Sequence, residues 1–183
     1  MVAQIRTPRA TWIDAGLEAL AAGGPDAVRV DLLAKALGVT RGGFYWHFAN
    51  RKDFLDAVLE VWEHRSTDDV LARVESEGGD ARAKVRRAGL LTFSKELLPV
   101  DLAVRDWARR DGAVAKRLRR VDNRRMEYLR DLIGTFVDDA ADVEARALLA
   151  FSLAIGAHFI AADHEGLSRR AVLERATQRL LTG

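Results

Sequence analysis

Residues 30–52, VDLLAKALGVTRGGFYWHFANRK, have the pattern of two short helices that are joined by a tight turn. The apolar residues of the first part recur at i, i+3, i+4 and i+7, which places them on one helical face: Val30, Leu33, Ala34 and Leu37. Gly38 follows, and the end of a helix favours a residue that can take a positive φ. Thr40 can cap a second helix by accepting a hydrogen bond from a backbone N–H. The stretch therefore predicts a helix-turn-helix with residues 40–48 as its recognition helix.

The second of these helices has two faces of different character. At about 100° per residue, Phe44 and Phe48 lie within about 40° of each other and face the protein. Trp46 lies roughly opposite this pair, with Tyr45 beside it. Large aromatic side chains on the outer face can reach phosphates and base edges when the helix occupies a major groove. The alternative interpretation is a small aromatic core followed by a loop.

The same residues resemble the DNA-binding segment of the TetR family of transcriptional regulators. The resemblance rests on GVTRGGFYWHF at residues 38–48 and on the basic pair at residues 51–52. It is supported by IDAGLEAL at residues 13–20 and by FLDAVL at residues 54–59. It covers roughly the first 62 residues, and the rest of the chain is similar only in length and helical pattern.

The recognition helix and the start of the next helix supply the predicted DNA contacts. Arg41 and Trp46 are expected nearest to the base edges. Two glycines near the start of the helix allow its backbone to approach a phosphate or a base closely, and the other residues are expected to hold phosphates. The predicted DNA-binding residues are Thr40, Arg41, Gly42, Gly43, Tyr45, Trp46, His47 and Lys52.

Several of these positions leave an alternative open. His47 fits a hydrogen-bonded structural histidine equally well, and Lys52 can be a solvated surface lysine. The family commonly has Ser or Thr at the position of Arg29, where the side chain caps the first helix of the motif. It often has Thr at the position of Gly43, so a common phosphate or base contact is absent there.

Length, composition and charge are those of a globular protein. The chain has 183 residues, of which 49% are apolar and 31% charged, and its lack of cysteine excludes a disulfide framework and Cys-ligated zinc. The start of the chain has no long apolar run, and the uncharged run at residues 147–162 is shorter than the roughly 20 residues of a membrane span. We therefore expect a cytoplasmic protein without a signal peptide or a membrane contact. Residues 1–52 hold seven Lys or Arg against four Asp or Glu, a net charge of +3, whereas the remainder nets 22 − 23 = −1. This asymmetry agrees in sign with DNA binding.

Hydrophobic periodicity predicts an all-α protein of about nine helices and no strand. We expect an N-terminal three-helix helix-turn-helix DNA-binding domain over residues 1–50. A C-terminal helical bundle for ligand binding and dimerisation is expected over residues 51–183. The predicted helices span residues 7–22, 30–37, 40–48, 50–75, 81–98, 100–110, 113–137, 143–163 and 168–181.

The eighth predicted helix is apolar on nearly all sides. Over residues 147–162 its only polar side chains are Ser152 and His158, and a helix of this kind is buried all round. A second copy of the chain is one way to cover it, which predicts a homodimer through the last two helices, as the family resemblance also implies. The alternative is that both faces pack within one subunit. The predicted dimer contact is a stripe of small residues: Ala147, Ala150, Ala154, Ala157 and Ala161.

The resemblance implies two partners. A homodimer with two recognition helices binds a palindromic operator in double-stranded DNA. A small-molecule effector enters the C-terminal bundle in such regulators and displaces the fourth helix. Residues that can line its pocket, each with plain core packing as the alternative, are Phe93, Trp107, Tyr128, Phe136, Phe151 and His158.

No catalytic, metal or cofactor site is predicted. His158 and Asp163 are five residues apart and do not share a helical face, which argues against a metal site with the neighbouring acidic residues. Ser94 and Ser152 lie in no nucleophile motif. The predicted function is that of a DNA-binding transcriptional regulator, a homodimeric repressor that a small molecule releases from its operator. The alternative is an all-helical small-molecule-binding protein that has lost specific DNA binding.

Overall fold

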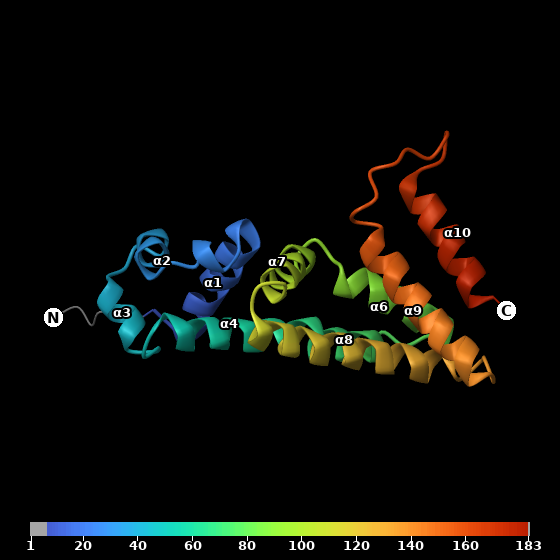
Figure 1. Cartoon of the computed structure of the whole chain (residues 1–183), viewed down its shortest axis with the longest axis horizontal. Coiled ribbons are helices and arrows are strands. Elements are labelled where there is room, and N and C mark those ends of the chain that lie inside the picture. The colour runs from blue at the N-terminus through green and yellow to red at the C-terminus, as the bar shows by residue number, and fades with distance from the viewer. Residues whose placement is uncertain (1–6, 183) are drawn as a thin grey trace. The chain divides into compact units, whose positions relative to one another are not determined.

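The computed structural model describes residues 7–182, and all regular elements in this range are helical (Figure 1). The predicted all-α fold is confirmed. The helices are α1 (Arg9–Gly23), η1 (Pro25–Ala27), α2 (Val30–Ala36), α3 (Arg41–Tyr45), α4 (Arg51–Ser66), α5 (Asp68–Ser76), α6 (Ala81–Thr92), α7 (Leu98–Ala108), α8 (Gly112–Ile133), α9 (Ala140–Gly156) and α10 (Arg169–Leu181). Within the described range, no helix is both long enough and apolar enough to span a bilayer.

Residues 50–75 form two helices rather than the one that was predicted. The break falls at Thr67, whose φ of −124° and ψ of −76° lie outside the helical region. Ser66 and Thr67 are both buried, and the Ser66 hydroxyl donates to the Glu63 carbonyl. Serine and threonine side chains compete with backbone groups for hydrogen bonds in this way, which disfavours a helix interior. The extra break accounts for the ten α-helices within residues 7–182, where about nine were expected.

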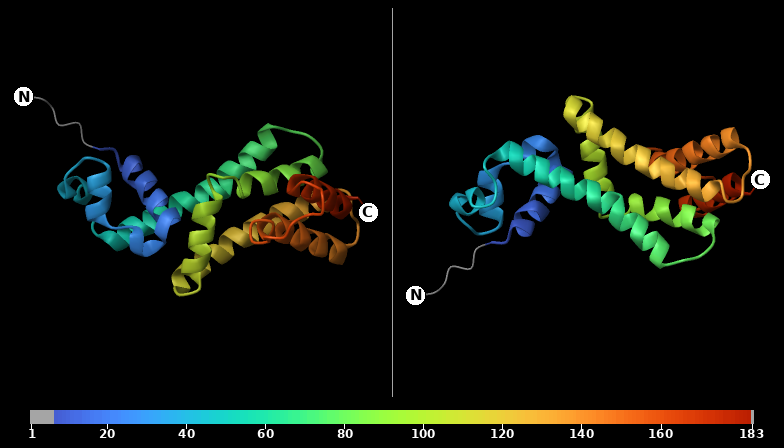
Figure 2. Two further views of the ribbon diagram at one scale, coloured as in Figure 1. Left: turned by 90° about the horizontal axis from the view of Figure 1, so that it is seen from above. Right: turned by 90° about the horizontal axis from the view of Figure 1, so that it is seen from below.

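The described chain divides into two compact units. The N-terminal unit contains residues 7–66 and Lys95–Arg119, and the C-terminal unit contains Thr67–Ser94 and residues 120–182. The predicted division after residue 50 concerns function rather than compactness and stays a prediction. In the N-terminal unit, α1, α2 and α3 gather around the first half of α4 (Figure 2).

Four fully buried aromatic residues form the core of the N-terminal unit. The Phe44 ring lies 5.5 Å from Trp12, 5.1 Å from Phe48 and 5.2 Å from Phe54, between ring centroids. Most of these pairs meet edge to face, the arrangement that aromatic quadrupoles favour. The cluster joins α1, α3 and α4, so it fixes the position of the short recognition helix.

The remaining helices of the N-terminal unit attach to α1 and α4. Helix α7 packs against α1. Asp101 on α7 is fully buried and pairs with Arg105 at 2.7 Å. Arg117, in the first part of α8, pairs with Glu63 on α4 at 3.1 Å. The Arg117–Glu63 pair links the second segment of the unit to the first, whereas the Asp101–Arg105 pair lies within α7.

The C-terminal unit consists of α5, α6, the second part of α8, α9 and α10. Its buried apolar cluster comprises Val85, Leu129, Leu132, Ile133, Ala147 and Leu181. Two arginines donate to carbonyls at the end of α10, Arg82 to Leu181 at 2.8 Å and Arg146 to Leu180 at 3.0 Å. Cationic donors are favourable at a helix C-terminus, because the last carbonyls have no partner within the helix.

Helix α9 is shorter than predicted. It ends at Gly156, and residues 157–168 are turns and irregular structure rather than helix to residue 163. Arg169 donates to the carbonyls of Ala157 and Ala162, at 2.8 and 3.3 Å, and these bonds hold the irregular segment. Apolar periodicity alone overestimated the length of this helix, because the pattern of apolar residues contains no information on contacts such as those of Arg169.

Candidate nucleic-acid interface

The helix-turn-helix is formed by α2, a turn and α3. Gly38 lies in the turn with a φ of +67°, as the sequence predicted for this glycine. Thr40 occupies the N-cap position of α3, but its side chain makes no capping hydrogen bond. Helix α3 covers only Arg41–Tyr45, although Phe48 still donates its N–H to the Phe44 carbonyl at 3.1 Å. A glycine pair in the first turn, with its low helix propensity, explains why the helix is short.

The two faces of the recognition helix are as the spacing predicted. Phe44 and Phe48 are buried, whereas Tyr45 is 54% exposed and Trp46 is 69% exposed. The Tyr45 ring packs against the buried Phe44 ring in a T-shaped arrangement, with 5.2 Å between the ring centroids. Tyr45 and Trp46, which both carry a polar group on a large ring, therefore lie on the outer face of the helix, while its inner face packs in the core.

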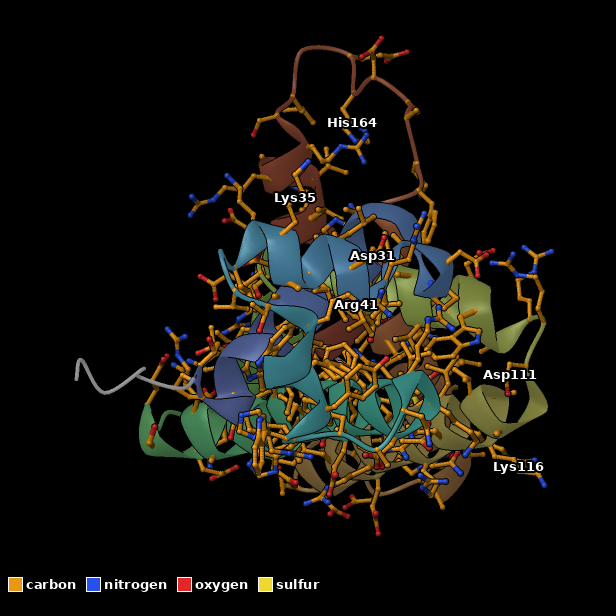
Figure 3. The ribbon with its side chains drawn as sticks, turned by 90° about the vertical axis from the view of Figure 1, so that its left-hand side faces the viewer. Asp31, Lys35, Arg41, Asp111, Lys116 and His164 are labelled. Atoms are coloured by element: carbon orange, nitrogen blue, oxygen red, sulfur yellow. The ribbon has the colours of Figure 1, made fainter. Side chains whose placement is uncertain are left out.

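Two exposed cationic residues flank the turn of the motif, one on α2 and one at the start of α3. Arg41 is exposed at the start of α3. Lys35 is exposed on α2, and Figure 3 shows both residues at this end of the N-terminal unit. Sequence reasoning missed Lys35, although its place just outside the apolar stripe of α2 was a signal for an outward-facing cation. Together the two side chains give the surface positive charge on both sides of the turn.

Both glycines of α3 leave space at the surface. A Cβ at Gly42 would lie 3.7 Å from Thr40 Oγ1, and a Cβ at Gly43 would lie 3.7 Å from a ring carbon of Trp12. These are ordinary van der Waals distances, so packing does not require glycine at either position. Gly42 is exposed and Gly43 is partly buried, and the close approach of DNA to their backbone stays a prediction.

His47 has a partner within the chain. Its Nε2 lies 2.9 Å from the Thr7 carbonyl oxygen and donates to it in the tautomer that this contact selects. The bond ties the segment before α1 to the end of the recognition helix. This geometry favours the structural alternative for His47 over a phosphate contact through the same nitrogen.

The start of α4 carries Lys52 and a capping box. The Lys52 side chain is 89% exposed and pairs with Asp56 at 3.2 Å. Asn50 accepts a hydrogen bond from the Asp53 N–H at 3.0 Å, and Asp53 accepts from the Ala49 N–H at 3.0 Å. Asn50 therefore caps the first turn of α4, and Asp53 accepts from the N–H just before the cap, in a variant of the capping box.

Arg51 is a positioning residue that sequence reasoning did not single out for this role. Its Nε donates to the Val28 carbonyl at 2.9 Å, and its Nη2 donates to the Pro25 carbonyl. Both acceptors lie in the segment just before α2. Arg51 therefore fastens the start of α4 to the first helix of the motif.

The first turn of α2 has a surface ion pair in place of a side-chain cap. Arg29 Nη2 lies 3.0 Å from Asp31 Oδ2, and Arg29 makes no capping hydrogen bond. Partial desolvation acts to raise the pKa of Asp31, but the hydrogen bond and the charge of Arg29 hold this pKa below its ordinary value. An ionised Asp31 in the first turn complements the helix dipole.

Comparison with known proteins identifies this architecture. Residues 13–58 match the model of bacterial regulatory proteins of the tetR family. Residues 13–58 are thus similar to the DNA-binding segment of tetR-family regulators. The chain is 40% identical over 62 residues to an uncharacterised HTH-type transcriptional regulator, TtgW of Pseudomonas putida, a match that covers 34% of this chain and 46% of that protein. The chain thus matches less than half the length of that curated relative.

Solved structures share the fold over nearly the whole chain. A regulator from Rhodococcus sp., described as a putative TetR-family member, has a TM-score of 0.61 at 25% identity, and the alignment covers 94% of each chain. AibR, crystallised with isovaleryl coenzyme A and operator DNA, has a TM-score of 0.68 at 14% identity, with 94% of this chain and 97% of AibR covered. TtgW and the Rhodococcus protein are described as transcriptional regulators and not as enzymes, in agreement with the prediction from sequence.

The C-terminal unit contains a small cavity of about 30 Å³ between α5, α6, α8 and α9. Three of the six predicted pocket residues line it, namely Phe93, Tyr128 and Phe151. Trp107 belongs to the N-terminal unit, and His158 is exposed beyond the end of α9. Phe136 instead packs under the guanidinium of Arg82, whose central carbon is 4.0 Å from the ring centroid.

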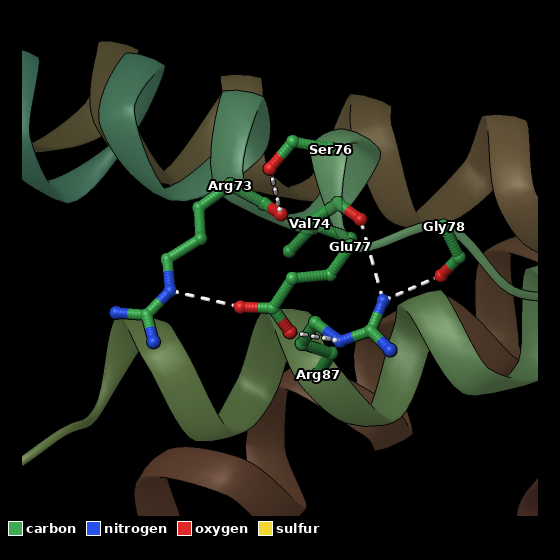
Figure 4. Close-up of polar contacts among 6 residues, drawn as sticks. All are labelled: Arg73, Val74, Ser76, Glu77, Gly78 and Arg87. Atoms are coloured by element: carbon green, nitrogen blue, oxygen red, sulfur yellow. Dashed lines mark hydrogen bonds and ion pairs between the residues drawn. The ribbon is translucent and has the colours of Figure 1, made fainter.

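One wall of this cavity is held by the corner between α5 and α6 (Figure 4). Arg87 on α6 donates to the carbonyls of Val74 and Gly78, at 3.3 and 2.6 Å. Its Nε pairs with Glu77 at 2.8 Å, and Glu77 also binds Arg73 at 2.9 Å. The guanidinium thus caps the end of α5 and ties it to α6. Sequence reasoning missed Arg87 because its acceptors are backbone carbonyls on another helix.

A second polar link joins the same wall to α8. Glu75 accepts hydrogen bonds from Lys84 on α6 and from the Tyr128 hydroxyl, the latter at 2.7 Å. The hydrogen bonds from Lys84 and then Tyr128 hold the pKa of Glu75 below its ordinary value. Burial and the bond to Glu75 raise the pKa of Tyr128, so its hydroxyl remains a donor.

The predicted alanine stripe of α9 lies mostly on the inner side of the helix. Ala147 is fully buried in the core cluster, and Ala150 and Ala154 line the cavity. A Cβ at Gly89 on α6 would lie 3.3 Å from Ala154 Cβ, so the small residues permit close packing of α6 against α9. The outer face instead carries exposed Leu148 and Leu149. Ala157 is partly buried and Ala161 is exposed in the irregular segment.

Proposed function

We propose that this chain is a sequence-specific DNA-binding transcriptional regulator whose helix α3 enters the major groove. The observation that carries the proposal is the exposure of Tyr45 and Trp46 on a helix whose other face is locked into an aromatic core. Apolar and hydrogen-bonding side chains at such positions can read base edges, including the methyl group of thymine. The curated relative TtgW is itself named as a transcriptional regulator.

Phosphate contacts in this proposal come from the cations around α3. Arg41 and Lys35 flank the turn, and Lys52 is exposed at the start of α4. Thr40 offers a hydroxyl that no capping bond occupies. His47 acts indirectly, because its bond to Thr7 fixes the end of the recognition helix. These side chains set the register of the protein on DNA, while the aromatic pair specifies sequence.

The active species in this proposal is a homodimer in the cytoplasm. Exposed Leu148 and Leu149 on α9 supply an apolar surface that a second copy would bury. The predicted alanine stripe contributes mainly to packing within the subunit, so we propose that the leucine face makes the contact between copies. A two-fold dimer would bind a palindromic operator.

The effector in this proposal is a small molecule in the cavity of the C-terminal unit. The cavity is lined mainly by apolar side chains, with a few polar groups, which is typical of ligand sites. AibR, with the same fold, was crystallised with isovaleryl coenzyme A and operator DNA. Binding of the effector would release the repressor from its operator.

Selection of binding sites from random duplex DNA tests the proposal. We expect an enriched palindrome whose affinity falls steeply as salt rises. Trp46→Ala should weaken the best site by roughly 1–3 kcal/mol and relax the base preference at one position. Leu90→Ala, which truncates an exposed residue of α6, is the matched control and should leave binding unchanged. A folded dimer that enriches no sequence would overturn the proposal in favour of a small-molecule-binding protein without specific DNA binding.

A further inference from the structure

The positive charge of the N-terminal unit lies mainly outside the helix-turn-helix. Residues 7–66 carry seven Lys or Arg against eight Asp or Glu, a net charge of −1. The second segment of the unit, residues 95–119, carries seven against four, a net charge of +3. Within this segment, residues 105–119 hold six Lys or Arg against two Asp, a net charge of +4. The excess of cations is therefore concentrated where α7 ends and α8 begins.

Three cations at this corner are exposed and make no ion pair within residues 7–182. They are Arg109 at the end of α7, and Lys116 and Arg119 on α8, and we call them the corner cations. Lys116 and Arg119 are three residues apart, so they lie on one face of α8. An exposed helical face with unpaired cations is a surface to which an external anion can bind.

The two acidic side chains of the corner have other partners. Asp106 pairs with Arg110 at 2.5 Å. Asp111 accepts hydrogen bonds from the N–H groups of Ala113 and Val114, at 2.9 and 3.2 Å, and so caps the start of α8. Neither carboxylate makes an ion pair with a corner cation, and all three positive charges remain available to a partner.

The corner belongs to the same compact unit as the recognition helix. Helix α7 packs against α1, and Arg117 on α8 pairs with Glu63 on α4 at 3.1 Å. Figure 3 looks onto the recognition-helix end and shows Lys116 projecting at the side of the unit, away from Arg41. A duplex on α3 therefore reaches the corner with base pairs that flank the operator rather than with the operator itself.

The chemistry of the corner fits a nucleic-acid backbone better than a membrane surface. A helix that lies on a membrane inserts an apolar face beside its cations. None of the exposed large hydrophobic residues in the described part of the chain lies within residues 95–119. Two of the three corner cations are arginines, and a guanidinium can donate two parallel hydrogen bonds to one phosphate. Duplex DNA presents such phosphates in a dense, regular array.

We propose that the corner between α7 and α8 is a second DNA-contacting surface, at which Arg109, Lys116 and Arg119 bind phosphates of the duplex that flanks the operator. The inference rests on the proposed function, because binding of α3 to the operator brings the flanking duplex to the corner. Phosphate contacts carry no base preference. The corner therefore adds affinity and lengthens the footprint without changing the operator sequence that is preferred.

Salt titrations with two duplexes test this inference. Both contain the operator selected from random DNA; the short duplex ends with the operator, and the long one adds about 20 base pairs, or two helical turns, on each side. The native protein should bind the long duplex more tightly. Its slope of log binding constant against log salt should be steeper there by about 2.7 for each subunit, about 0.9 for each of three phosphates. The triple variant Arg109→Gln, Lys116→Gln and Arg119→Gln should lose this difference and bind the short duplex normally.

A matched control separates the corner from a general loss of charge. Arg86 on α6 is also an exposed arginine without an ion pair in the described range. Arg86→Gln should retain the full effect of the flanks, whereas each single substitution at the corner should reduce the slope on the long duplex by about 0.9. Far-UV circular dichroism of the variants checks that they are folded, as expected for exposed positions.

The outcomes distinguish this inference from the proposed function. An enriched operator without any effect of the flanks, or an effect that persists in the triple variant, would overturn the corner as a DNA surface and leave the regulator standing. If no operator is enriched, both proteins are titrated with a long duplex of random sequence. A shallower slope for the triple variant would then support the corner alone, and equal slopes would overturn it. Binding of the native protein to phosphatidylserine vesicles, without an effect of the flanks, would replace DNA with a membrane as the partner.

Discussion

The two units of this chain use their buried aromatic residues in opposite ways. In the N-terminal unit Trp12, Phe44 and Phe54 are fully buried and contact one another, so the space around the recognition helix is closed. In the C-terminal unit the rings of Phe93 and Phe151, 5.8 Å apart, border a cavity. The difference indicates that the N-terminal unit holds the recognition helix in a fixed position, whereas the C-terminal unit retains a cavity that a ligand can fill.

The largest expected effect compares one phenylalanine from each core. Phe54→Ala should destabilise the N-terminal unit by roughly 3–5 kcal/mol, because a fully buried ring leaves a cavity in a closed cluster. Phe151→Ala should cost less than about half of that, because the ring is only partly buried and already borders empty space. All four tryptophans lie in the N-terminal unit, so tryptophan fluorescence during urea unfolding measures the loss in Phe54→Ala, and far-UV circular dichroism, which reports the helices of both units, measures the loss in Phe151→Ala. Equal losses for the two variants would remove the distinction between the cores.

Two glycines of the N-terminal unit give the next contrast. A Cβ at Gly16 would lie 2.6 Å from Phe54 Cζ and 2.8 Å from Val58 Cγ2, so Gly16→Ala should cost about 1–3 kcal/mol by overpacking. Gly43→Ala meets only an ordinary contact with Trp12 and should stabilise the unit by up to about 1 kcal/mol through helix propensity. The same fluorescence-detected unfolding measures both. A destabilised Gly43→Ala protein would show that the core behind α3 is tighter than its distances indicate.

A third contrast separates positioning from binding at the start of α4. Arg51→Ala removes two hydrogen bonds to backbone carbonyls and should cost about 1–3 kcal/mol of stability. Lys52→Ala should leave stability within about 0.5 kcal/mol, because its ion pair is exposed. It should instead reduce the slope of log binding constant against log salt by about 0.9, the value for one phosphate contact. An unchanged salt slope would make Lys52 a solvated surface residue.

The sequence predicted the features that depend on neighbours along the chain. The spacing of Phe44 and Phe48 and the turn at Gly38 are local patterns, and the structure has both of them. Positions that depend on distant partners were not predictable in this way.

Three residues show why the rest could not be predicted. Arg51 and Arg87 donate to carbonyls on other elements, and backbone acceptors leave no signature in side-chain patterns. Residues 147–156 are apolar on nearly all sides. Periodicity therefore did not show whether the alanine face or the leucine face of this helix is buried. The contact between Gly89 and Ala154 decides this in the structure, since two small residues allow α6 and α9 to approach closely.

The smallest expected effect concerns acid sensitivity of the cavity wall. Lys84 and Tyr128 lower the pKa of Glu75 in the folded protein, so its contribution to stability is present above the unfolded pKa of about 4.3. That contribution is lost as pH falls below this value through the folded pKa. Glu75→Gln should therefore flatten the decline in stability of the C-terminal unit between about pH 5 and pH 3. Far-UV circular dichroism is the readout, because tryptophan fluorescence does not report on this unit.

Glu127→Gln, at an exposed position of α8, is the control and should retain the decline in stability at low pH. An unchanged decline in Glu75→Gln would mean that other carboxylates set the acid limit of this unit, such as Glu144, whose pKa is lowered by its hydrogen bond with Arg130.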